Sequence, residues 1–266
     1  MIFVSTSVYA LAKELGANDA VAEVHRQLGE LAALGSAAQP SGDYLPACMV
    51  IARLRLLDEL ELRVDAGATC IGKARSRHFH AFRKSKAPVW VSVDDDVDAT
   101  KQTLEWLVDA VHPGGLAAPH YPPRICLAPC LLRGPRHELT LNVELPQVVM
   151  HRKLTNGGMV RNCNGGGFGL VALNRGAVDA IVSSVLACSP KFADGIGDLD
   201  WLDDDKEIKL AVFHDELSQS KWWGEDRSFF RRVPKSVELE CLAAGVVSHD
   251  HLVLDLSKVR ELGVPF

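Results

Sequence analysis

The sequence lacks any run of about 18 apolar residues, so no segment is long and apolar enough to cross a membrane as a helix. It also lacks a Cys-x-x-Cys pair, the spacing typical of zinc sites, although it holds seven cysteines. An odd number of scattered cysteines indicates reduced thiols in an intracellular protein. No positively charged segment precedes the first apolar residues, so we expect no secretory signal and a cytoplasmic location.

An excess of basic residues is missing as well. The formal net charge is -5, which argues against a protein that holds nucleic acid by bulk charge, although a local basic patch is compatible with it. A hydrophobic fraction of 47% and a charged fraction of 24% are ordinary for a globular protein. With 266 residues and no low-complexity linker, we expect residues 1–266 to form one domain of two abutting sub-lobes.

The most informative stretch is Val89–Asp98, where a short β-branched apolar run ends at three consecutive carboxylates, Asp94, Asp95 and Asp96. In open α/β sheets, ligands bind beyond the carboxyl ends of the strands. Carboxylate oxygens there suit Mg2+ or Mn2+, which leave coordination positions open for phosphates. The pattern therefore predicts a metal-bridged phosphate site, against the alternative of a solvated acidic turn.

The residues before this stretch predict a Rossmann-like α/β unit. Ile2–Val4 is typical of a buried strand, and Ser5, Thr6 and Ser7 are expected to open a loop at the ligand edge. Apolar residues at helical spacing up to Leu34 predict a helix capped by Asn18 or Asp19. The segment from Ala47 is ambiguous and is expected to end as a strand near Asp65. Thr69–Lys86 then predicts a strongly basic helix, whose cations would suit a diphosphate.

After the acidic stretch, we expect a helix over Ala99–Val111 and a half-exposed strand over Leu139–Leu145. A glycine-rich segment, Gly165–Gly169, precedes an apolar run and a helix over Ala177–Leu186, and glycines allow a ligand or a backbone to approach closely. Farther on come Trp222-Trp223-Gly224-Glu225-Asp226 and, near the end, His249 and His251.

In order, these pieces resemble the metal-dependent glycosyltransferases of the GT-A fold. Lys73-Ala-Arg75-Ser-Arg77 followed by Val-Ser-Val-Asp94-Asp-Asp96 is similar to that family's basic helix and Asp-x-Asp strand. Gly165-Gly-Gly-Phe-Gly resembles its glycine-rich acceptor border, Gly224-Glu225-Asp226 its Glu-Asp motif, and Val-Val-Ser-His249 its late metal histidine. The resemblance implies a mixed, mostly parallel sheet flanked by helices. Residues 1–98 would form the nucleotide-sugar half, and residues 99–266 the acceptor and catalytic half.

The resemblance also implies roles for individual residues. The donor is expected to be a nucleotide-diphosphate sugar, with UDP as the expected nucleotide. The Mn2+ or Mg2+ ion would be held by Asp94, Asp96 and His249, with His251 as the alternative histidine. Glu225 or Asp226 would orient the acceptor hydroxyl or remove its proton. The remaining donor and acceptor contacts are expected from Ser5, Thr6, Ser7, Arg75, Arg77, Asp94, Asp95, Gly166, Gly167 and Trp223.

Two other functions fit parts of the sequence. Asp96-Val-Asp98-Ala-Thr100 also resembles the signature of haloacid dehalogenase-like phosphatases, with Asp96 as nucleophile, Asp98 as acid/base, and Gly197-Asp198 with Asp203 as the late acidic motif. That signature normally opens its domain, whereas a basic helix precedes it here. The other function is a domain that binds a sugar or nucleotide without turnover.

The acceptor is left open between a small molecule, a protein, a glycan and modified bases in DNA. The last of these is suggested by basic residues in Lys73–Lys86 and by Arg227, Arg231, Arg232 and Lys235, which could contact phosphates. Neither the sugar, the stereochemical outcome nor the oligomeric state follows from the sequence.

Overall fold

The computed structural model describes residues 1–34, 44–66, 71–113, 121–130, 150–188, 200–202, 208–210, 212–218, 221–249 and 252–256. Its helices are α1 (Tyr9–Leu15), α2 (Ala17–Leu34), α3 (Pro46–Arg55), α4 (Ile71–Lys84), α5 (Lys101–Val111), α6 (Arg175–Cys188) and α8 (Glu225–Arg232). Its strands are β1 (Ile2–Val8), β2 (Leu60–Ala66), β3 (Val89–Asp94), β4 (Val97–Ala99), β5 (Arg124–Leu127), β6 (His151–Lys153), β7 (Met159–Asn162), β8 (Leu170–Asn174), β9 (Asp200–Leu202), β10 (Ile208–Leu210), β11 (Glu216–Ser218), β12 (Lys221–Trp223), β13 (Glu238–Leu242), β14 (Val246–His249) and β15 (Leu252–Asp255).

The architecture centres on an eight-stranded sheet in the order β2-β1-β3-β8-β5-β13-β7-β6. The strands β2, β1 and β3 are mutually parallel, β8 is antiparallel to both of its neighbours, and β13 runs parallel to β5. Of the eight strands, only β8 and β7 oppose the common direction. The predicted α/β fold with a mixed, mostly parallel sheet is therefore confirmed.

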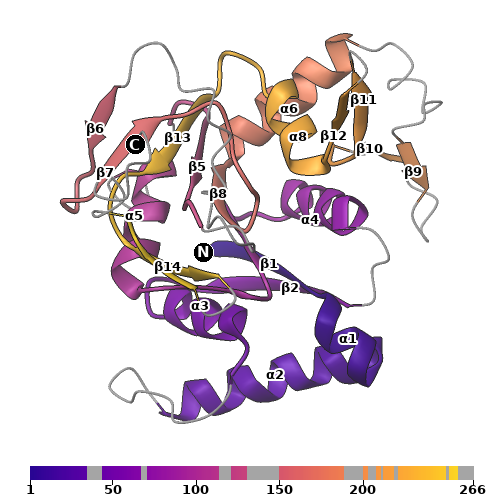
Figure 1. Ribbon diagram of the computed structural model, residues 1–266, viewed down its shortest axis with the longest axis vertical. Coiled ribbons are helices and arrows are strands. Elements are labelled where there is room, and N and C mark those ends of the chain that lie inside the picture. The colour runs from indigo at the N-terminus through magenta and orange to yellow at the C-terminus, as the bar shows by residue number, and fades with distance from the viewer. Residues whose placement is uncertain are drawn as a thin grey trace.

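Helices cover both faces of this sheet. Figure 1 shows α1, α2 and α3 on one side of β1 and β2, with α4 on the other side and α8 beyond it. A smaller sheet, β15-β14-β4, continues from the acidic end of β3, because β4 follows that strand after two residues and pairs with β14. This arrangement brings His249, at the end of β14, opposite Val97 of β4. Among the described helices, none is long and apolar enough to span a membrane.

Most sequence predictions of elements near the acidic strand are confirmed. The basic helix forms as α4, the apolar run forms as β3, and β2 follows the ambiguous segment. Two predictions were wrong. Asn18 and Asp19 do not cap a helix, because α2 already begins at Ala17 and both lie in its first turn. Ser5, Thr6 and Ser7 do not open a loop, because they continue β1 as far as Val8. Their hydroxyls are accommodated inside the sheet, where Ser5 Oγ accepts a hydrogen bond of 2.8 Å from Trp90 Nε1. The strand expected over Leu139–Leu145 lies outside the described residues.

Trp90 anchors β3 in the core. It is fully buried and packs against Phe79 and Phe82 of α4 and against Phe168, with ring centroids 5.9 to 6.1 Å apart. Because α4 carries the basic residues and β3 the acidic ones, these contacts fix the position of the two elements relative to each other. Arg175, at the start of α6, adds hydrogen bonds to the carbonyl oxygens of Phe82, Ser85 and Ala87 near the end of α4.

We predict that Trp90→Ala lowers the free energy of unfolding by about 3–5 kcal/mol, because it leaves a cavity between α4 and β3. Urea unfolding followed by circular dichroism measures this change. Trp90→Phe is the matched control, since it keeps an aromatic ring in the core and should cost less, losing part of the ring volume and the hydrogen bond to Ser5. A loss below about 1 kcal/mol for Trp90→Ala would contradict the anchoring role.

Candidate functional site

Three parallel strands deliver polar residues to one edge of the sheet. Ser7 of β1 lies opposite Asp94 of β3 on one side and opposite Asp65 of β2 on the other. Since these strands are parallel, all three residues lie near the carboxyl ends of their strands. The backbone N–H of Asp94 donates a hydrogen bond of 2.8 Å to Gly169 O, so the glycine-rich segment borders the same edge.

Arg75 of α4 lies at the centre of this edge. Its side chain is only 4% exposed, and it contacts Asp94 and, from a distant part of the sequence, the neighbouring Glu225 and Asp226. Nη2 donates to both oxygens of Asp94 at 2.9 and 3.0 Å, while Nη1 donates to Glu225 Oε1 at 3.2 Å and to Asp226 Oδ1. Burial disfavours the guanidinium cation, but the three carboxylates outweigh it and raise the pKa of Arg75 above its ordinary value.

The glycine-rich segment joins this cluster through Phe168. Its backbone N–H donates to Asp226 Oδ2 at 3.0 Å, and its ring lies 5.3 Å from the Arg75 guanidinium carbon. Gly165 makes the close approach possible: its φ is +116°, and a Cβ there would lie 2.6 Å from Phe230 of α8. Phe168 also packs against Phe213, Phe229 and Phe230, so an aromatic cluster supports the charged one.

Carboxylates outnumber cations at this edge. Burial, followed by the charges of Asp96 and Asp94, raises the pKa of Asp95 to about 6. Burial also raises the pKa of Asp226 to about 6, against the lowering effect of Arg75 and with a further rise from Glu225 and Asp94. Asp226 is surrounded by protein, although 27% of its side-chain surface reaches solvent. Burial is the largest cause of both rises, and the neighbouring carboxylates add to it, an addition that another cation would relieve.

The donors that fit a divalent cation best are Asp96 and His249. His249 Nε2 lies 3.3 Å from Asp96 Oδ2. Two ligands about 2.1 Å from one ion, at octahedral or tetrahedral angles, lie about 3.0–3.4 Å apart, so this pair fits as adjacent ligands of one metal. Asp94 is instead engaged with Arg75. Within the described residues, no three His, Cys, Asp or Glu side chains converge as a complete metal site.

Asp98, two residues beyond Asp96, lies in a different environment. It forms an ion pair with Arg53 of α3, and the same guanidinium donates to Ala99 O at 2.8 Å. Thr100 caps α5, because its Oγ1 accepts a hydrogen bond from Thr103 N. Asp98 and Thr100 therefore stabilise the junction of α3, β4 and α5.

The remaining residues expected at the site have varied positions. Ser5 and Thr6 are buried in β1, so Ser7 is the member of that trio that reaches the edge. Arg77 is half-buried on α4, one residue from His78. Gly166 is buried and Gly167 half-buried, next to Phe168. Trp223 ends β12 just before α8, but its side chain lies outside the described residues, as does His251.

Sequence reasoning missed Asp65 and His78. His78 Nε2 lies 3.2 Å from Asp65 Oδ2, but the two atoms are not aligned for a hydrogen bond. Burial lowers the pKa of His78, which favours the neutral imidazole. A single aspartate at the end of a strand gives little signal alone. Its position opposite Ser7 becomes informative only once the strand register is known.

Comparisons with known proteins add little here. No protein-family model matches the chain, and no curated protein matches it. Among solved structures, it is similar to one titled "Crystal Structure of A197 from STIV", with 13% sequence identity and a TM-score of 0.45 over 96% of this chain and 90% of that one. At those values the similarity indicates nothing about function.

We predict that Arg75→Met lowers the free energy of unfolding by about 3–5 kcal/mol at pH 8, because it leaves three partly buried carboxylates without their buried cation. In the intact protein the pKa of Asp226 is already raised from its ordinary value of 3.8 to about 6. Because Arg75 lowers this pKa, loss of Arg75 raises it further. A carboxylate with a raised folded-state pKa destabilises the fold as the pH rises through that pKa. The defect should therefore shrink as the pH falls towards about 4.

Urea unfolding at several pH values, in EDTA, measures this effect. Arg53→Met is the matched control, since it removes an arginine from the half-exposed pair with Asp98 and should cost less, with little dependence on pH between 4 and 8. Equal, pH-independent losses in both variants would contradict the central role of Arg75.

Proposed function

We propose that the protein is a glycosyltransferase that moves a sugar from a nucleotide-diphosphate donor to an acceptor hydroxyl with the aid of a divalent cation. The observation that carries this proposal is the convergence of Asp94, Asp96, His249, Glu225 and Arg75 at the carboxyl edge of parallel strands. That edge is where α/β sheets bind ligands, and the surplus of carboxylates there favours a cation. The GT-A resemblance of the motifs supports the same assignment.

The donor half of the site would be built from β1, β2 and β3. Ser7, Asp65 and Asp94 lie side by side there, and the buried Asp65 Oδ2, which lies 3.2 Å from His78 Nε2, has no aligned hydrogen-bond donor among the described residues. Unpartnered buried acceptors are costly unless a ligand supplies N–H or O–H groups, as a nucleoside does. We assign the nucleoside to this region and the diphosphate to the neighbouring Asp96.

The metal would be held by Asp96 and His249, with its remaining positions filled by the donor's phosphates and water. Bound there, Mn2+ or Mg2+ would neutralise the negative charge that develops on the leaving diphosphate. The chain's contribution is to hold the two ligands at 3.3 Å on β14 and on the turn after β3. Arg75 donates to both carboxylate oxygens of Asp94 and so fixes the position of that side chain. Held in this way, Asp94 can orient the hydroxyls of the sugar or the ribose.

Glu225 is the better candidate for the base. Both oxygens of Asp226 are engaged, Oδ1 by Arg75 and Oδ2 by the N–H of Phe168. Glu225 instead accepts from Arg75 through Oε1 alone, at the longer distance of 3.2 Å. We therefore assign proton removal from the acceptor to Glu225 and the positioning of Arg75 and Phe168 to Asp226.

The phosphatase alternative gains no support from this geometry. It needs Asp98 as an acid/base beside Asp96, and Asp98 is instead paired with Arg53. The residues of its late acidic motif, Asp198 and Asp203, lie outside the described residues. A binding domain without turnover would use the same residues, and activity measurements separate it from an enzyme. The acceptor, including modified DNA bases, stays a prediction.

We predict that a nucleoside diphosphate, with UDP the first to try, raises the melting temperature in Mn2+ but not in EDTA. Ligand at about a hundredfold excess over its Kd adds about 2.7 kcal/mol to the stability. Asp96→Asn and His249→Ala should lose the metal-dependent shift, whereas Asp98→Asn, the control two residues away, should keep it. No shift with any nucleotide, together with phosphate-ester hydrolysis that requires Asp98, would favour the phosphatase.

We also predict that Glu225→Gln lowers the turnover of the donor sugar, with water or an acceptor, about 10²–10⁴-fold while the metal-dependent nucleotide shift is kept. The amide keeps the Oε1 contact with Arg75 but cannot take a proton. Asp226→Asn is the comparison, and it should lower the melting temperature as well as turnover. If Glu225→Gln retains full turnover, the base must be another group.

A further inference from the structure

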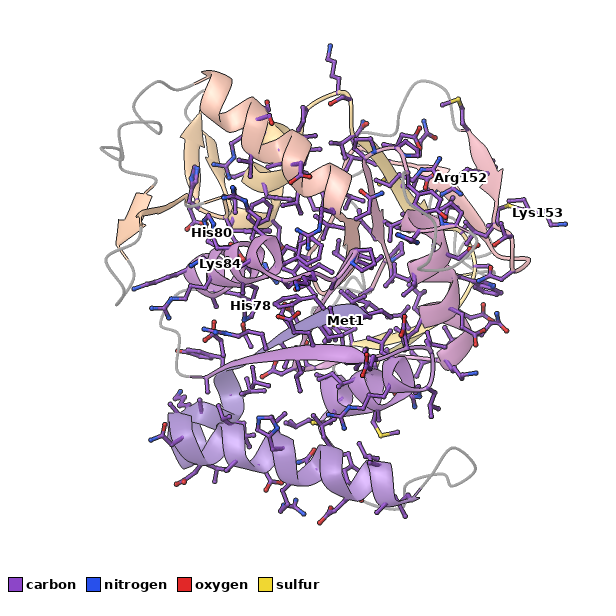
Figure 2. All side chains as sticks on the ribbon, turned by 180° about the vertical axis from the view of Figure 1, so that it is seen from behind. Met1, His78, His80, Lys84, Arg152 and Lys153 are labelled. Carbon is purple, nitrogen blue, oxygen red and sulfur yellow. The ribbon has the colours of Figure 1, made fainter. Side chains whose placement is uncertain are left out.

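The two edges of the main sheet differ. One edge strand, β6, has three residues, and Figure 2 shows two of them, Arg152 and Lys153, on the opposite side of the molecule from α4. Short, charged strands resist pairing with another chain. The other edge strand, β2, has seven residues and alternates apolar and charged side chains. Among the described residues it pairs with β1 alone, so its outer backbone groups have no strand partner there.

The register of β1 and β2 shows which groups face outward. Ile2 N–H donates to Glu59 O, and Leu60 lies opposite Ile2. In a parallel pair, alternate residues turn their N–H and C=O groups to the partner strand, here Glu59, Glu61 and Arg63. The backbone groups of Leu60, Leu62 and Val64 therefore point away from β1, along the open edge.

These outward groups match a second copy of the same strand. If two β2 strands pair antiparallel with Leu62 opposite Leu62, the hydrogen-bonded positions are Leu62 with itself and Leu60 with Val64. Those are the residues whose backbone groups face outward. On the face where Leu60, Leu62 and Val64 lie, their half-buried apolar side chains would cover one another across the twofold axis.

The charged face is self-complementary in the same register. Glu61 of each copy lies opposite Arg63 of the other, and Arg63 is 51% exposed, with only a long contact of 4.0 Å to Asp65 within its own chain. The next positions bring Asp65 opposite Glu59, but Asp65 turns inward against His78 and is 15% exposed. Centring the pair on Glu61 or Arg63 would instead place like charges opposite each other. The charges therefore select the Leu62 register.

Exposed apolar residues flank the strand. Tyr9 and Leu15 of α1, which contacts β2, are 59% and 46% exposed, and Leu56, just before β2, is 50% exposed. Antiparallel pairing brings the start of one β2 near the end of the other, so these side chains would extend the contact beyond the backbone ladder.

We propose that β2 is a self-association surface, at which two copies of the chain join their sheets through antiparallel β2 strands centred on Leu62. This proposal stands apart from the proposed function, because it depends on the outer edge of β2 and not on the metal or the nucleotide. The metal ligand Asp96 and its neighbour Asp94 would lie away from the dimer contact, since they follow β3, the third strand from that edge.

Sedimentation velocity of the full chain over a hundredfold range of concentration tests the proposal, with EDTA present to exclude metal effects. The expected result is a reversible dimer. Glu61→Arg and Arg63→Glu, each alone, place like charges opposite each other twice per dimer and should raise the dimer Kd about tenfold or more. The double variant Glu61→Arg/Arg63→Glu restores both pairs in reversed order and should dimerise again.

Mixing the two single variants gives the sharpest control. The Glu61→Arg chain carries two arginines on this face and the Arg63→Glu chain carries two glutamates, so every arginine of one would face a glutamate of the other. A heterodimer should therefore form from two weakly associating proteins, and native mass spectrometry resolves it. Circular dichroism checks that each variant is folded.

A wild-type chain that stays monomeric, or a dimer that the single variants leave intact and the mixture does not strengthen, would overturn the proposal. Loss of nucleotide binding with an intact dimer would instead count only against the proposed function.

Discussion

The buried guanidinium of Arg75 is the interaction on which the candidate site depends. It joins Asp94 at the end of β3 to Glu225 and Asp226 at the start of α8, residues separated by more than 100 positions in the chain. The buried cation is stable because the carboxylates compensate its charge, and the carboxylates depend on the cation in the same way. Removing any one of them therefore changes the stability of the others. The aromatic cluster around Phe168 supplies the low-dielectric surroundings that make these contacts strong and specific.

The sequence predicts the parts of this arrangement that local patterns encode. The apolar run and the acids after it predicted β3 and its acidic carboxyl end, and the periodicity of Ile71, Ala74, Phe79 and Phe82 predicted α4. The burial of Arg75 could not be predicted, because an arginine among other cations on a helix normally faces solvent. Its burial follows from tertiary contacts with α8, which no local pattern records.

The error at Ser5, Thr6 and Ser7 has the same cause. Small hydroxyl residues usually leave strands for turns, and here they remain in β1 because β2 and β3 flank that strand on both sides and Trp90 supplies a donor for Ser5. The roles of Asp65 and His78 likewise depend on strand register, since Asp65 becomes part of the edge only by lying opposite Ser7. The sequence pattern predicted which residues are candidates for the site, and tertiary packing decides which of these residues contact one another.

The position of β13 has a consequence for synthesis of the protein. This strand, Glu238–Leu242, lies between β5 and β7 in the sheet although both of those strands precede it in the chain. A ribosome therefore exposes β5 and β7 before the strand that joins them has been made, and Asp226 also emerges long after Arg75. Until then the nascent chain carries two unjoined strand edges, and Arg75 lacks two of its three carboxylate partners, so chaperones that shield open strands should matter most late in translation.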